Sequence, residues 1–569
     1  MKQWRLVAIF SLGVAVAAII IGRLFYLQVL EGKFYQSQAL GQQTGFAEVQ
    51  GARGEIFFDN SKETLGAEGS GEIKSLAINT DAWIVSAVPQ NIKDKNAFAD
   101  AVSKPLGYTK EDLLNKLKES DTYVILKKGV DAATTDALRK LNIDGLSFEN
   151  SPERYYPQES LAAQVIGFVG GQNTGQYGVE AYYNDILAGK KGIKQNLKGL
   201  DLIGANQTEQ NLDGSDLYLT IDYNIQYQAE ALLKQAHKDI DIDSGQIIVI
   251  KPDSGRILAM ANYPSFNPND YGKETSFEVF QNSTVQKLFE PGSVFKPFTM
   301  AMGLQEGKIT PESTFTDTGS VTIGPNTLYN FDREKYGFSD MSRILEKSIN
   351  TGAVFVEQKI PHATFFDYVN KFGFNDKTGI DVQGEVSSNN DRLKKGADFD
   401  YATASFGQGI ELTPIQLVKA FCVFADGGKM PSPYIVEKTV NGSDEQDVKP
   451  QTSDPVISEQ TASEVTKMMI NVVEKGFGSS ARVPGYYLAG KTGTAEVPME
   501  NQKGYYSDRT IQSFIGFGPA LNPKFLILVK FDNPKVPKSS LSAAPVFKKM
   551  AQYIINYWQI PPDYSVSTK

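Results

Sequence analysis

The stretch Glu290-Pro-Gly-Ser-Val-Phe-Lys-Pro-Phe-Thr299 contains the only S-x-x-K motif of this 569-residue chain, Ser293-Val-Phe-Lys296. Its residues are typical of the start of a helix, where side chains three positions apart share one face. An unprotonated lysine at that spacing can take the proton of the serine hydroxyl. Ser293 is therefore a candidate nucleophile, although about two such motifs are expected by chance in a chain of this length.

The composition limits which group can serve as the base. Only two histidines, His237 and His362, and one cysteine, Cys422, are present. A Ser-His-Asp triad and a zinc site of the His/Cys type are both disfavoured by these counts. A lysine is the base that fits, and we expect neither a metal nor a cofactor.

The charge balance argues against binding to nucleic acid. The chain has 57 basic and 66 acidic residues, a net charge of -9 at pH 7, and no basic low-complexity tract. Proteins that bind phosphate backbones carry clustered Lys and Arg side chains. We therefore expect no nucleic-acid partner.

The N-terminal segment predicts a membrane anchor. An uncharged apolar run from Leu6 to Gly22 continues into Arg23-Leu-Phe-Tyr-Leu-Gln-Val-Leu30, which together approach the length of a membrane-spanning helix. A cleaved signal peptide is the alternative, but the only A-x-A sequence, Ala15 to Ala17, lies inside the apolar run. We predict a single-pass anchor in the cell membrane over residues 6–30, with residues 1–5 in the cytoplasm and the catalytic part outside it.

The hydrophobic pattern divides the rest of the chain into two regions and a short tail. Residues 31–240 mix short strands, helices and turns without a catalytic constellation, and we interpret them as a scaffold. Residues 241–560 begin with a strand hairpin, continue mainly as helices and end with three strands and a helix. If the five strands join, they form one antiparallel sheet of a non-contiguous α/β domain. The predicted segments are strands Gly245–Ile250, Arg256–Ala261, Tyr486–Val497, Gln512–Gly518 and Phe525–Phe531, helix Ala543–Trp558, and the tail 561–569.

S-x-x-K occurs with an S-x-N and a K-T-G element in serine acyl-transfer enzymes, and both are found downstream, each at two places in the chain. Ser348-Ile-Asn350 follows a helical segment, whereas Ser387-Ser-Asn389 and the overlapping Ser388-Asn-Asn390 lie in a polar loop. A hydroxyl and an amide that must orient a proton relay need a rigid support. We therefore select Ser348 and Asn350.

The two K-T-G elements differ in the same way. Lys377-Thr-Gly379 lies in a turn-rich segment, and Lys491-Thr-Gly-Thr494 continues a predicted strand. A strand with a glycine at the edge of a cleft lets a peptide substrate approach and pair with the backbone. We therefore select Lys491, Thr492, Gly493 and Thr494.

With these elements in this order, the chain resembles the class B penicillin-binding proteins, the monofunctional peptidoglycan transpeptidases, over most of residues 5–555. One departure is Phe57-Phe-Asp-Asn-Ser-Lys62, where the family usually has aspartate, arginine, asparagine and glycine. Further matching segments are Arg53-Gly-Glu-Ile56, Arg154-Tyr-Tyr-Pro157, Gly175–Glu180, Leu219-Thr-Ile-Asp222, Gly373–Ile380, Gly407-Gln-Gly409 and Thr413-Pro414.

The resemblance implies an α/β transpeptidase domain of the penicillin-binding and serine β-lactamase type over residues 241–560. Its sheet is expected to have five antiparallel strands, with an all-helical lobe beside it. Residues 31–240 are expected to form an elongated α+β pedestal of the dimerisation-domain type, after the N-terminal transmembrane helix.

The resemblance also implies the chemistry. Ser293 attacks the penultimate D-alanyl carbonyl of a stem peptide that ends in D-Ala-D-Ala, and Lys296 is the base. Ser348 relays the proton, Asn350 orients Lys296 and the substrate amide, and the backbone N–H groups of Ser293 and Thr494 form the oxyanion hole. Lys491, Thr492 and Thr494 hold the terminal carboxylate, with Gly493 between them.

The implied function is cross-linking of stem peptides through a Ser293 acyl-enzyme in septal wall synthesis, with β-lactams as covalent inhibitors. The alternatives are an elongation-type transpeptidase and a protein of the same fold that hydrolyses or senses β-lactams. The implied partners are a membrane glycan polymerase of the SEDS type (shape, elongation and division) and division proteins.

Overall fold

The computed structural model describes residues 13–14, 17, 20–21, 23–26, 46–59, 73–171, 173–195, 212–499 and 504–565. The predicted anchor over residues 6–30 lies mostly outside these ranges. Within them, no helix has both the length and the apolar character that crossing a membrane requires. The anchor and the limits of the predicted domains therefore stay predictions.

The chain forms two compact units. The smaller comprises residues 1–54, 185–215 and 441–443. Its strand β1 (Phe46–Gln50) pairs antiparallel with β10 (Lys191–Gln195). The larger unit holds the rest of the chain and all the candidate site residues.

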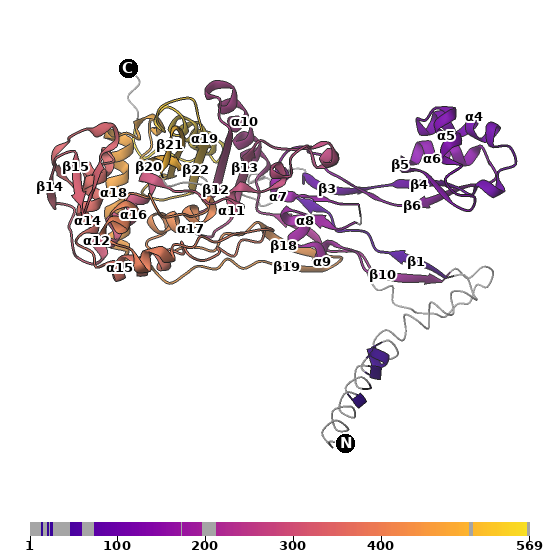
Figure 1. The fold of residues 1–569 in the computed structure, drawn as a ribbon, viewed down its shortest axis with the longest axis horizontal. Helices are drawn as coiled ribbons and strands as arrows, with labels where there is room; N and C mark the ends of the chain where they lie inside the picture. The colour runs from indigo at the N-terminus through magenta and orange to yellow at the C-terminus, as the bar shows by residue number, and fades with distance from the viewer. Residues whose placement is uncertain are drawn as a thin grey trace, which may run out of the picture. The chain divides into compact units, whose positions relative to one another are not determined.

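A five-stranded antiparallel sheet is the centre of the larger unit, as predicted (Figure 1). Its order is β13-β12-β22-β21-β20, so strands from the two ends of the domain are neighbours and β20 is an edge strand. Successive residues of β12 and β22 are buried, so both faces of the sheet are covered. The strands are β12 (Ser244–Ile250), β13 (Ile257–Tyr263), β20 (Ala489–Pro498), β21 (Tyr505–Gly518) and β22 (Phe525–Asp532).

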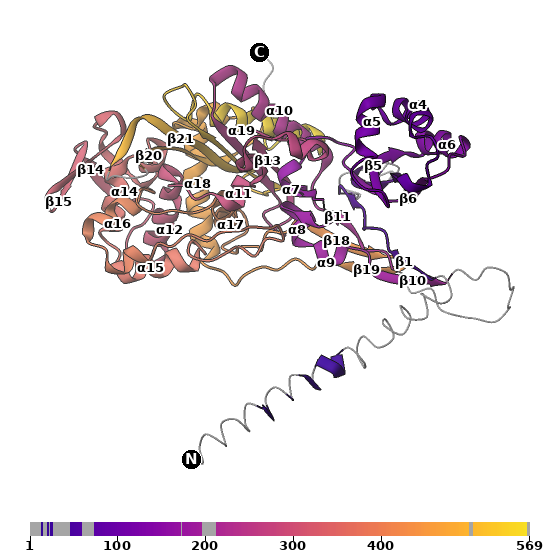
Figure 2. The same ribbon diagram turned by 45° about the vertical axis from the view of Figure 1, so that its right-hand side comes forward.

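Two helices cover one face of this sheet, α10 (Tyr223–Ile240) beside β13 and α19 (Ala543–Tyr557) beside β22 (Figure 2). Asp222 caps α10 by accepting hydrogen bonds from the N–H groups of Asn224 and Ile225, as the sequence predicted. Val546, Met550 and Ile554 form the buried stripe of α19. These helices share one hydrophobic core with the strands.

The second lobe contains the helices that carry part of the site, but it is not all helical, so that expectation was wrong. Residues 314–340 form two small antiparallel pairs, β14 (Thr314–Asp317) with β17 (Gly337–Asp340) and β15 (Ser320–Ile323) with β16 (Asn326–Tyr329). Thr- and Ser-rich alternation around the turn at Gly324 favours hairpins over helix here. The helices are α12 (Lys296–Gln305), α13 (Met341–Glu346), α14 (Asn350–Glu357), α15 (His362–Lys371), α16 (Asp398–Ala404), α17 (Pro414–Ala425) and α18 (Glu459–Lys475).

The scaffold part of the larger unit contains a six-stranded and a three-stranded sheet, besides the short pair β8 (Phe168–Val169) with β9 (Gly175–Gln176). In the six-stranded sheet, β18 and β19 come from residues beyond 435 and extend strands from the N-terminal half. The three-stranded sheet β5-β4-β6 packs with α4, α5 and α6 around a core of its own. The bounds are β2 (Ile56–Phe57), β3 (Ser75–Thr80), β7 (Glu153–Tyr155), β11 (Asp216–Leu219), β18 (Val436–Asn441), β19 (Asp444–Asp447), β4 (Ala82–Ala87), β5 (Val124–Asp131), β6 (Leu146–Asn150), α4 (Lys95–Leu106), α5 (Lys110–Lys116) and α6 (Ala132–Lys140).

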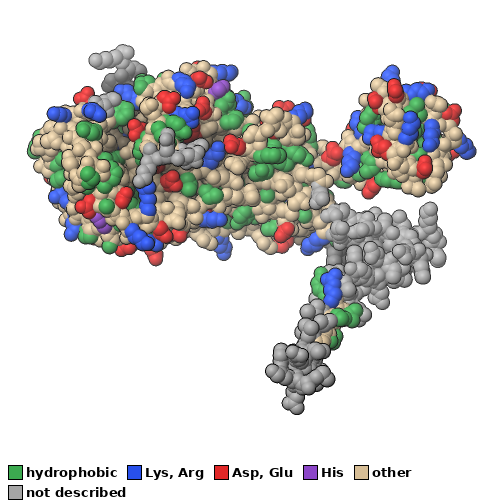
Figure 3. All heavy atoms as spheres, in the orientation of Figure 1, with side chains coloured by type: hydrophobic (Ala, Val, Ile, Leu, Met, Phe, Trp, Pro, Cys, Tyr) green, Lys and Arg blue, Asp and Glu red, His purple; other side chains and the backbone are tan. Residues whose placement is uncertain are grey.

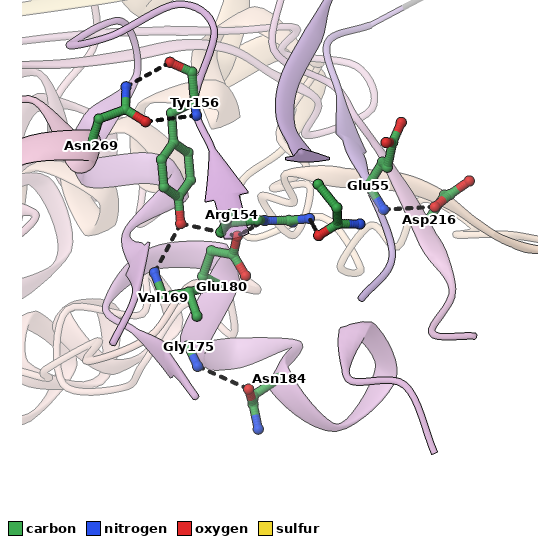
Figure 4. A network of polar contacts seen from close by, with 10 residues as sticks. Glu55, Arg154, Tyr156, Val169, Gly175, Glu180, Asn184, Asp216 and Asn269 are labelled. Atoms are coloured by element: carbon green, nitrogen blue, oxygen red, sulfur yellow. Dashed lines mark hydrogen bonds and ion pairs between the residues drawn. The ribbon is translucent and has the colours of Figure 1, made fainter. Parts of the chain in front are cut away.

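A buried ion pair stabilises the scaffold segment that carries Arg154 (Figure 4). The Arg154 guanidinium contacts the Glu180 carboxylate at 2.7 Å, and the Tyr156 hydroxyl donates to the same carboxylate at 3.3 Å. The N–H of Val169 donates to the Tyr156 oxygen at 2.9 Å. Arg154, Glu180 and Tyr156 therefore form one buried network that joins β7 to α8 (Gly178–Tyr182) and β8.

Acidic and basic side chains are interspersed over the face of the molecule shown in Figure 3. A nucleic-acid-binding face usually concentrates Lys and Arg. The mixed charge of this face agrees with the net charge of -9.

Candidate active site

The candidate nucleophile lies in a tight turn that leads into a helix. Ser293 is in the 3-10 segment Gly292–Phe295, which continues directly as α12 from Lys296. Gly292 has a φ of 60°, and its N–H donates to the Gly407 carbonyl oxygen at 2.9 Å. A Cβ on Gly407 would lie 2.1 Å from the Gly292 oxygen. Two glycines therefore allow a second loop to hold the start of the helix.

The amine of Lys296 is buried and is surrounded by oxygen atoms. The side chain is 1% exposed, and Nζ lies 2.9 Å from the Ser293 hydroxyl oxygen. Nζ also donates to the carbonyl oxygen of Ser348 at 2.6 Å and to Oδ1 of Asn350 at 2.7 Å. These two carbonyl oxygens can only accept hydrogen bonds, so they bind the two N–H groups of a neutral Lys296 amine. The lone pair of the amine is then left to accept the proton of the Ser293 hydroxyl.

Ser348 and Asn350 occupy the junction of two helices. Ser348 follows helix α13, as the sequence indicated, but its φ of 54° places it in a left-handed turn between α13 and α14 rather than in a helix. Asn350 is the first residue of α14, and its Nδ2 donates to the carbonyl oxygen of Tyr329 at 3.0 Å. The turn directs both the hydroxyl and the carbonyl of Ser348 toward Lys296.

A second buried lysine comes from the edge strand β20. Nζ of Lys491 donates to the hydroxyl oxygen of Ser348 at 3.0 Å, and the side chain is fully buried. Ser348 therefore lies between the two amines. Gly493 is required by packing, since a Cβ there would lie 2.4 Å from Oγ of Ser513 and 2.9 Å from the Val294 side chain. Strand β20 thus lies directly beside the nucleophile turn.

The surroundings lower the pKa of both amines. Burial, and secondarily the neighbouring Lys491, lower the pKa of Lys296 well below its ordinary value. Burial lowers the pKa of Lys491 to about 7. Because two like charges next to one hydroxyl are unfavourable, a base competent to deprotonate Ser293 is available near neutral pH.

These groups lie at a cleft of about 1270 Å³, which exceeds the usual size of a small-molecule pocket. Its wall includes Ser293, Ser348, Asn350, Thr492 and Thr494. The structure therefore brings the three selected motifs together around one opening.

Comparison with known proteins gives the family. Residues 245–552 match the family described as penicillin binding protein transpeptidase domain, and residues 49–219 match the penicillin-binding protein dimerisation domain. The chain belongs to the class B penicillin-binding proteins.

Relatives match this penicillin-binding protein over nearly its whole length. Stage V sporulation protein D of Bacillus subtilis is 31% identical and matches over 95% of this chain and 84% of its own. A peptidoglycan D,D-transpeptidase FtsI homolog of Mesostigma viride is 29% identical, over 99% of this chain and 97% of its own.

Solved structures are also similar. A peptidoglycan synthetase from Bifidobacterium adolescentis has a TM-score of 0.70 at 26% identity and covers 92% of this chain and 98% of its own. Penicillin Binding Protein 2X from Streptococcus thermophilus has a TM-score of 0.74 at 21% identity, and the match covers 90% of this chain and 81% of that protein. At this identity the similarity supports the fold alone.

The rejected motif copies have structural contacts in this penicillin-binding protein. The backbone N–H groups of Thr378 and Gly379 donate to the Glu385 carboxylate at 2.6 and 3.1 Å. The Ser388 hydroxyl donates to the Phe374 carbonyl oxygen. Neither copy lines the cleft.

Two carboxylates beside the site were missed by the sequence analysis. Glu290 accepts a hydrogen bond from the Gly409 N–H at 2.8 Å and from the Tyr505 hydroxyl at 3.1 Å. Asp317 accepts from the Thr351 hydroxyl at 2.6 Å, next to Asn350. Glu290 is adjacent in sequence to the nucleophile turn, which is a signal for it, but no local signal indicates Asp317.

Proposed function

We propose that this penicillin-binding protein is a peptidoglycan D,D-transpeptidase that acts through a Ser293 acyl-enzyme. The observation that carries the proposal is the geometry of Lys296, a buried amine with its Nζ 2.9 Å from the Ser293 hydroxyl and two carbonyl oxygens on its other donors. That arrangement activates a serine without a histidine.

In acylation, Lys296 takes the hydroxyl proton while Ser293 Oγ bonds to the carbonyl carbon of the penultimate D-alanine. Ser348, in contact with both lysine amines, returns a proton to the leaving nitrogen. The C–N bond then breaks, the last D-alanine leaves, and an ester to Ser293 remains. The amine of a second stem peptide attacks this ester, restores the Ser293 hydroxyl and forms the cross-link.

The substrate is held by the edge strand β20. As the last strand of the sheet, β20 has one edge without a strand partner, to which an extended peptide can add. The backbone N–H groups of Ser293 and Thr494 form the oxyanion hole, which contributes about 3 kcal/mol per donor to the transition state. Lys491, Thr492 and Thr494 bind the terminal carboxylate, whose negative charge favours the protonated form of the Lys491 amine, with its pKa of about 7 in the free protein.

Labelling with a fluorescent penicillin tests the nucleophile and the base. Ser293→Ala is expected to abolish covalent labelling, and Lys296→Ala to slow it by at least about a hundredfold, because general base assistance contributes that much. Lys377→Ala, in the rejected K-T-G element, is the matched control and is expected to label normally. Stoichiometric labelling of folded Ser293→Ala would contradict the assignment.

Transpeptidation and hydrolysis differ in the fate of the acyl-enzyme. The labelled protein is expected to keep its penicillin for many minutes, because the proposed mechanism uses the amine of a second peptide, and not an activated water, to attack the acyl-enzyme ester. Release within seconds would instead indicate a β-lactam hydrolase.

The cellular role is proposed as septal wall synthesis, with the protein anchored by residues 6–30 and its catalytic part outside the membrane. The apolar N-terminal run supports the anchor. A SEDS-type glycan polymerase is the proposed partner. A fluorescent fusion is expected at the septum, and uniform side-wall fluorescence would favour the elongation alternative.

A further inference from the structure

The wall of the active-site cleft is cationic in an acidic protein. Among the side chains that the structure describes, nine charged ones line the cleft, six basic and three acidic, whereas the whole chain carries a net charge of -9. The acidic ones are Glu334, Glu496 and Asp508. The basic ones, called the cationic rim below, are Arg333, Arg343, Lys347, Arg509, Lys535 and Lys538.

Three rim cations are held by aromatic rings that also line the cleft. The Arg333 guanidinium carbon lies 4.6 Å from the centre of the Tyr329 ring, and that of Arg509 lies 4.5 Å from the centre of the Tyr506 ring. Nζ of Lys347 lies 5.4 Å from the centre of the Phe477 ring. A ring attracts a cation through its quadrupole but does not neutralise it, so the charge remains available to a ligand.

The rim cations are not paired with carboxylates in the part of the chain that the structure describes, where the ion pairs lie elsewhere. Arg333 also has a φ of 56°, an unfavourable conformation for a residue other than glycine. Such conformations are found preferentially at binding sites. The same Arg333 therefore combines a strained backbone with a guanidinium that forms no ion pair with a described carboxylate.

The reaction itself does not account for this charge. In the proposed function, the terminal carboxylate of the substrate binds Lys491, Thr492 and Thr494 on β20. The rim belongs to other segments: the 3-10 turn after β16, helix α13, the start of β21 and the loop after β22. A further anionic group on the bound peptide would complement these cations.

We propose that the cationic rim selects stem peptides that carry a free internal carboxylate in addition to the C-terminal one, over peptides in which that carboxylate is amidated. The inference rests on the proposed function, because it concerns the peptide that the Ser293 site receives. Arg333 and Arg509 are the principal specificity residues, since each presents a planar guanidinium suited to carboxylate.

Binding to the full chain with Ser293→Ala tests the inference without the chemical step. The probes are two fluorescent pentapeptides that end in D-Ala-D-Ala and differ only at the second residue, glutamate in one and glutamine in the other. Fluorescence anisotropy is expected to show about fivefold tighter binding of the glutamate peptide at low salt, since exposed ion pairs each contribute modestly. The preference is expected to shrink as salt is raised.

Charge-removing variants connect the preference to the rim. Adding Arg333→Gln and Arg509→Gln together is expected to abolish the preference while leaving the glutamine peptide's affinity unchanged. Lys359→Gln is the matched control, because Lys359 Nζ also lies over a ring, that of Phe355 at 4.5 Å, but does not line the cleft. It is expected to keep the preference.

Equal binding of the two peptides, or a preference that survives the double substitution, would overturn the inference. Penicillin labelling of the unsubstituted protein separates this result from a failure of the proposed function. Normal labelling, together with equal binding of the two peptides to Ser293→Ala with the rim intact, refutes the selectivity alone. Absence of labelling in the unsubstituted protein refutes the function.

Discussion

Lys296 and Lys491 place two amines on either side of one hydroxyl, 3.1 and 3.0 Å from Oγ of Ser348. In water both lysines would be protonated at neutral pH. Here burial lowers both pKa values, and the charge of Lys491 lowers that of Lys296 further. The protonation state of Lys296 therefore depends on the charge of Lys491, and a pH profile reports on the pair.

Removing Lys491 is expected to shift the pH dependence of acylation. Lys296 is the active base only when neutral, so the rate falls as pH drops through its pKa in the folded protein. In Lys491→Gln the neighbouring cation is gone, the pKa of Lys296 rises, and the acid limb moves to higher pH. The measurement is the second-order rate of penicillin acylation between about pH 5 and 9. Lys377→Gln is the control, and an unmoved limb in Lys491→Gln would contradict the coupling.

Gly407 is expected to tolerate no side chain. It has a φ of 83°, and a Cβ would lie 2.1 Å from the Gly292 oxygen, so Gly407→Ala must displace the nucleophile turn. Acylation is expected to fall at least about tenfold, with a loss of several kcal/mol in the free energy of unfolding. Thermal melting and penicillin labelling measure the two effects.

Gly307→Ala is the matched control for this prediction. Gly307 has a φ of 61°, but a Cβ added there would meet no other atom within 4 Å, so only the backbone strain of about 1 kcal/mol is expected. Equal effects of the two substitutions would show that the contact with Gly292 is unimportant.

At the scale of elements, the segment of small strands from β14 to β17, residues 314–340, supports helix α14. The Asp317 carboxylate in β14 accepts hydrogen bonds from the Thr351 hydroxyl at 2.6 Å and from the Tyr336 N–H at 2.8 Å. Asn330 donates to Asp317 at 2.8 Å and accepts from the Thr351 N–H at 3.1 Å. The start of α14, and with it Asn350, is therefore fixed by residues that lie well before it in the chain.

Asp317→Asn is expected to loosen this support. Burial by itself would raise the pKa of Asp317. The hydrogen bonds to its carboxylate, with that of Thr351 the largest, outweigh the effect of burial, so the pKa is lowered overall. Because the pKa is lower in the folded protein, the ionised carboxylate stabilises the fold fully at a pH above the pKa of Asp317 in the unfolded chain. This stabilisation is lost as the pH falls through the pKa of the folded protein. The variant is expected to lose about 2 kcal/mol at about pH 7, less at about pH 3, and to acylate about tenfold more slowly. Urea unfolding at the two pH values and labelling measure this, and an unchanged stability at neutral pH would contradict it.

At the scale of the whole molecule, Arg256 connects the β12–β13 hairpin of the five-stranded sheet to the six-stranded sheet of the scaffold, within the larger unit. Its guanidinium contacts Asp59 at 3.1 Å and also Glu437 of β18. Breaking a buried pair leaves uncompensated carboxylates. The scaffold therefore depends on a residue of the β12–β13 turn.

Arg256→Met is expected to lower the free energy of unfolding by about 3 kcal/mol without changing the acylation rate below the unfolding temperature. Lys273→Met is the control, because its pair with Asp270 is exposed and is worth less than about 1 kcal/mol. Calorimetry and labelling measure the two properties. A melting temperature equal to that of the control would show that the Arg256 contacts do not stabilise the fold.

Much of the architecture could be predicted because its signals are local. The apolar strands of the central sheet, the Asp222 cap and the apolar stripe of α19 need only neighbouring residues to be recognised. The pairing of β18 with β11 joins residues that are far apart in the chain, and neither strand's sequence carries a sign of its partner. The hairpins within 314–340 were missed for a related reason, since short polar strands have little periodicity.

The sequence by itself determined the choice of chemistry: one S-x-x-K, two candidates for each later motif and almost no histidine. Strand or turn context was sufficient to choose between the copies, because rigid supports are recognisable locally. Only the tertiary structure decided that Lys296, Ser348 and Lys491 meet in a buried site, and that Ser348 does so from a left-handed turn. The protonation state of a lysine depends on desolvation and on neighbouring charges, and both are created only when distant segments pack together.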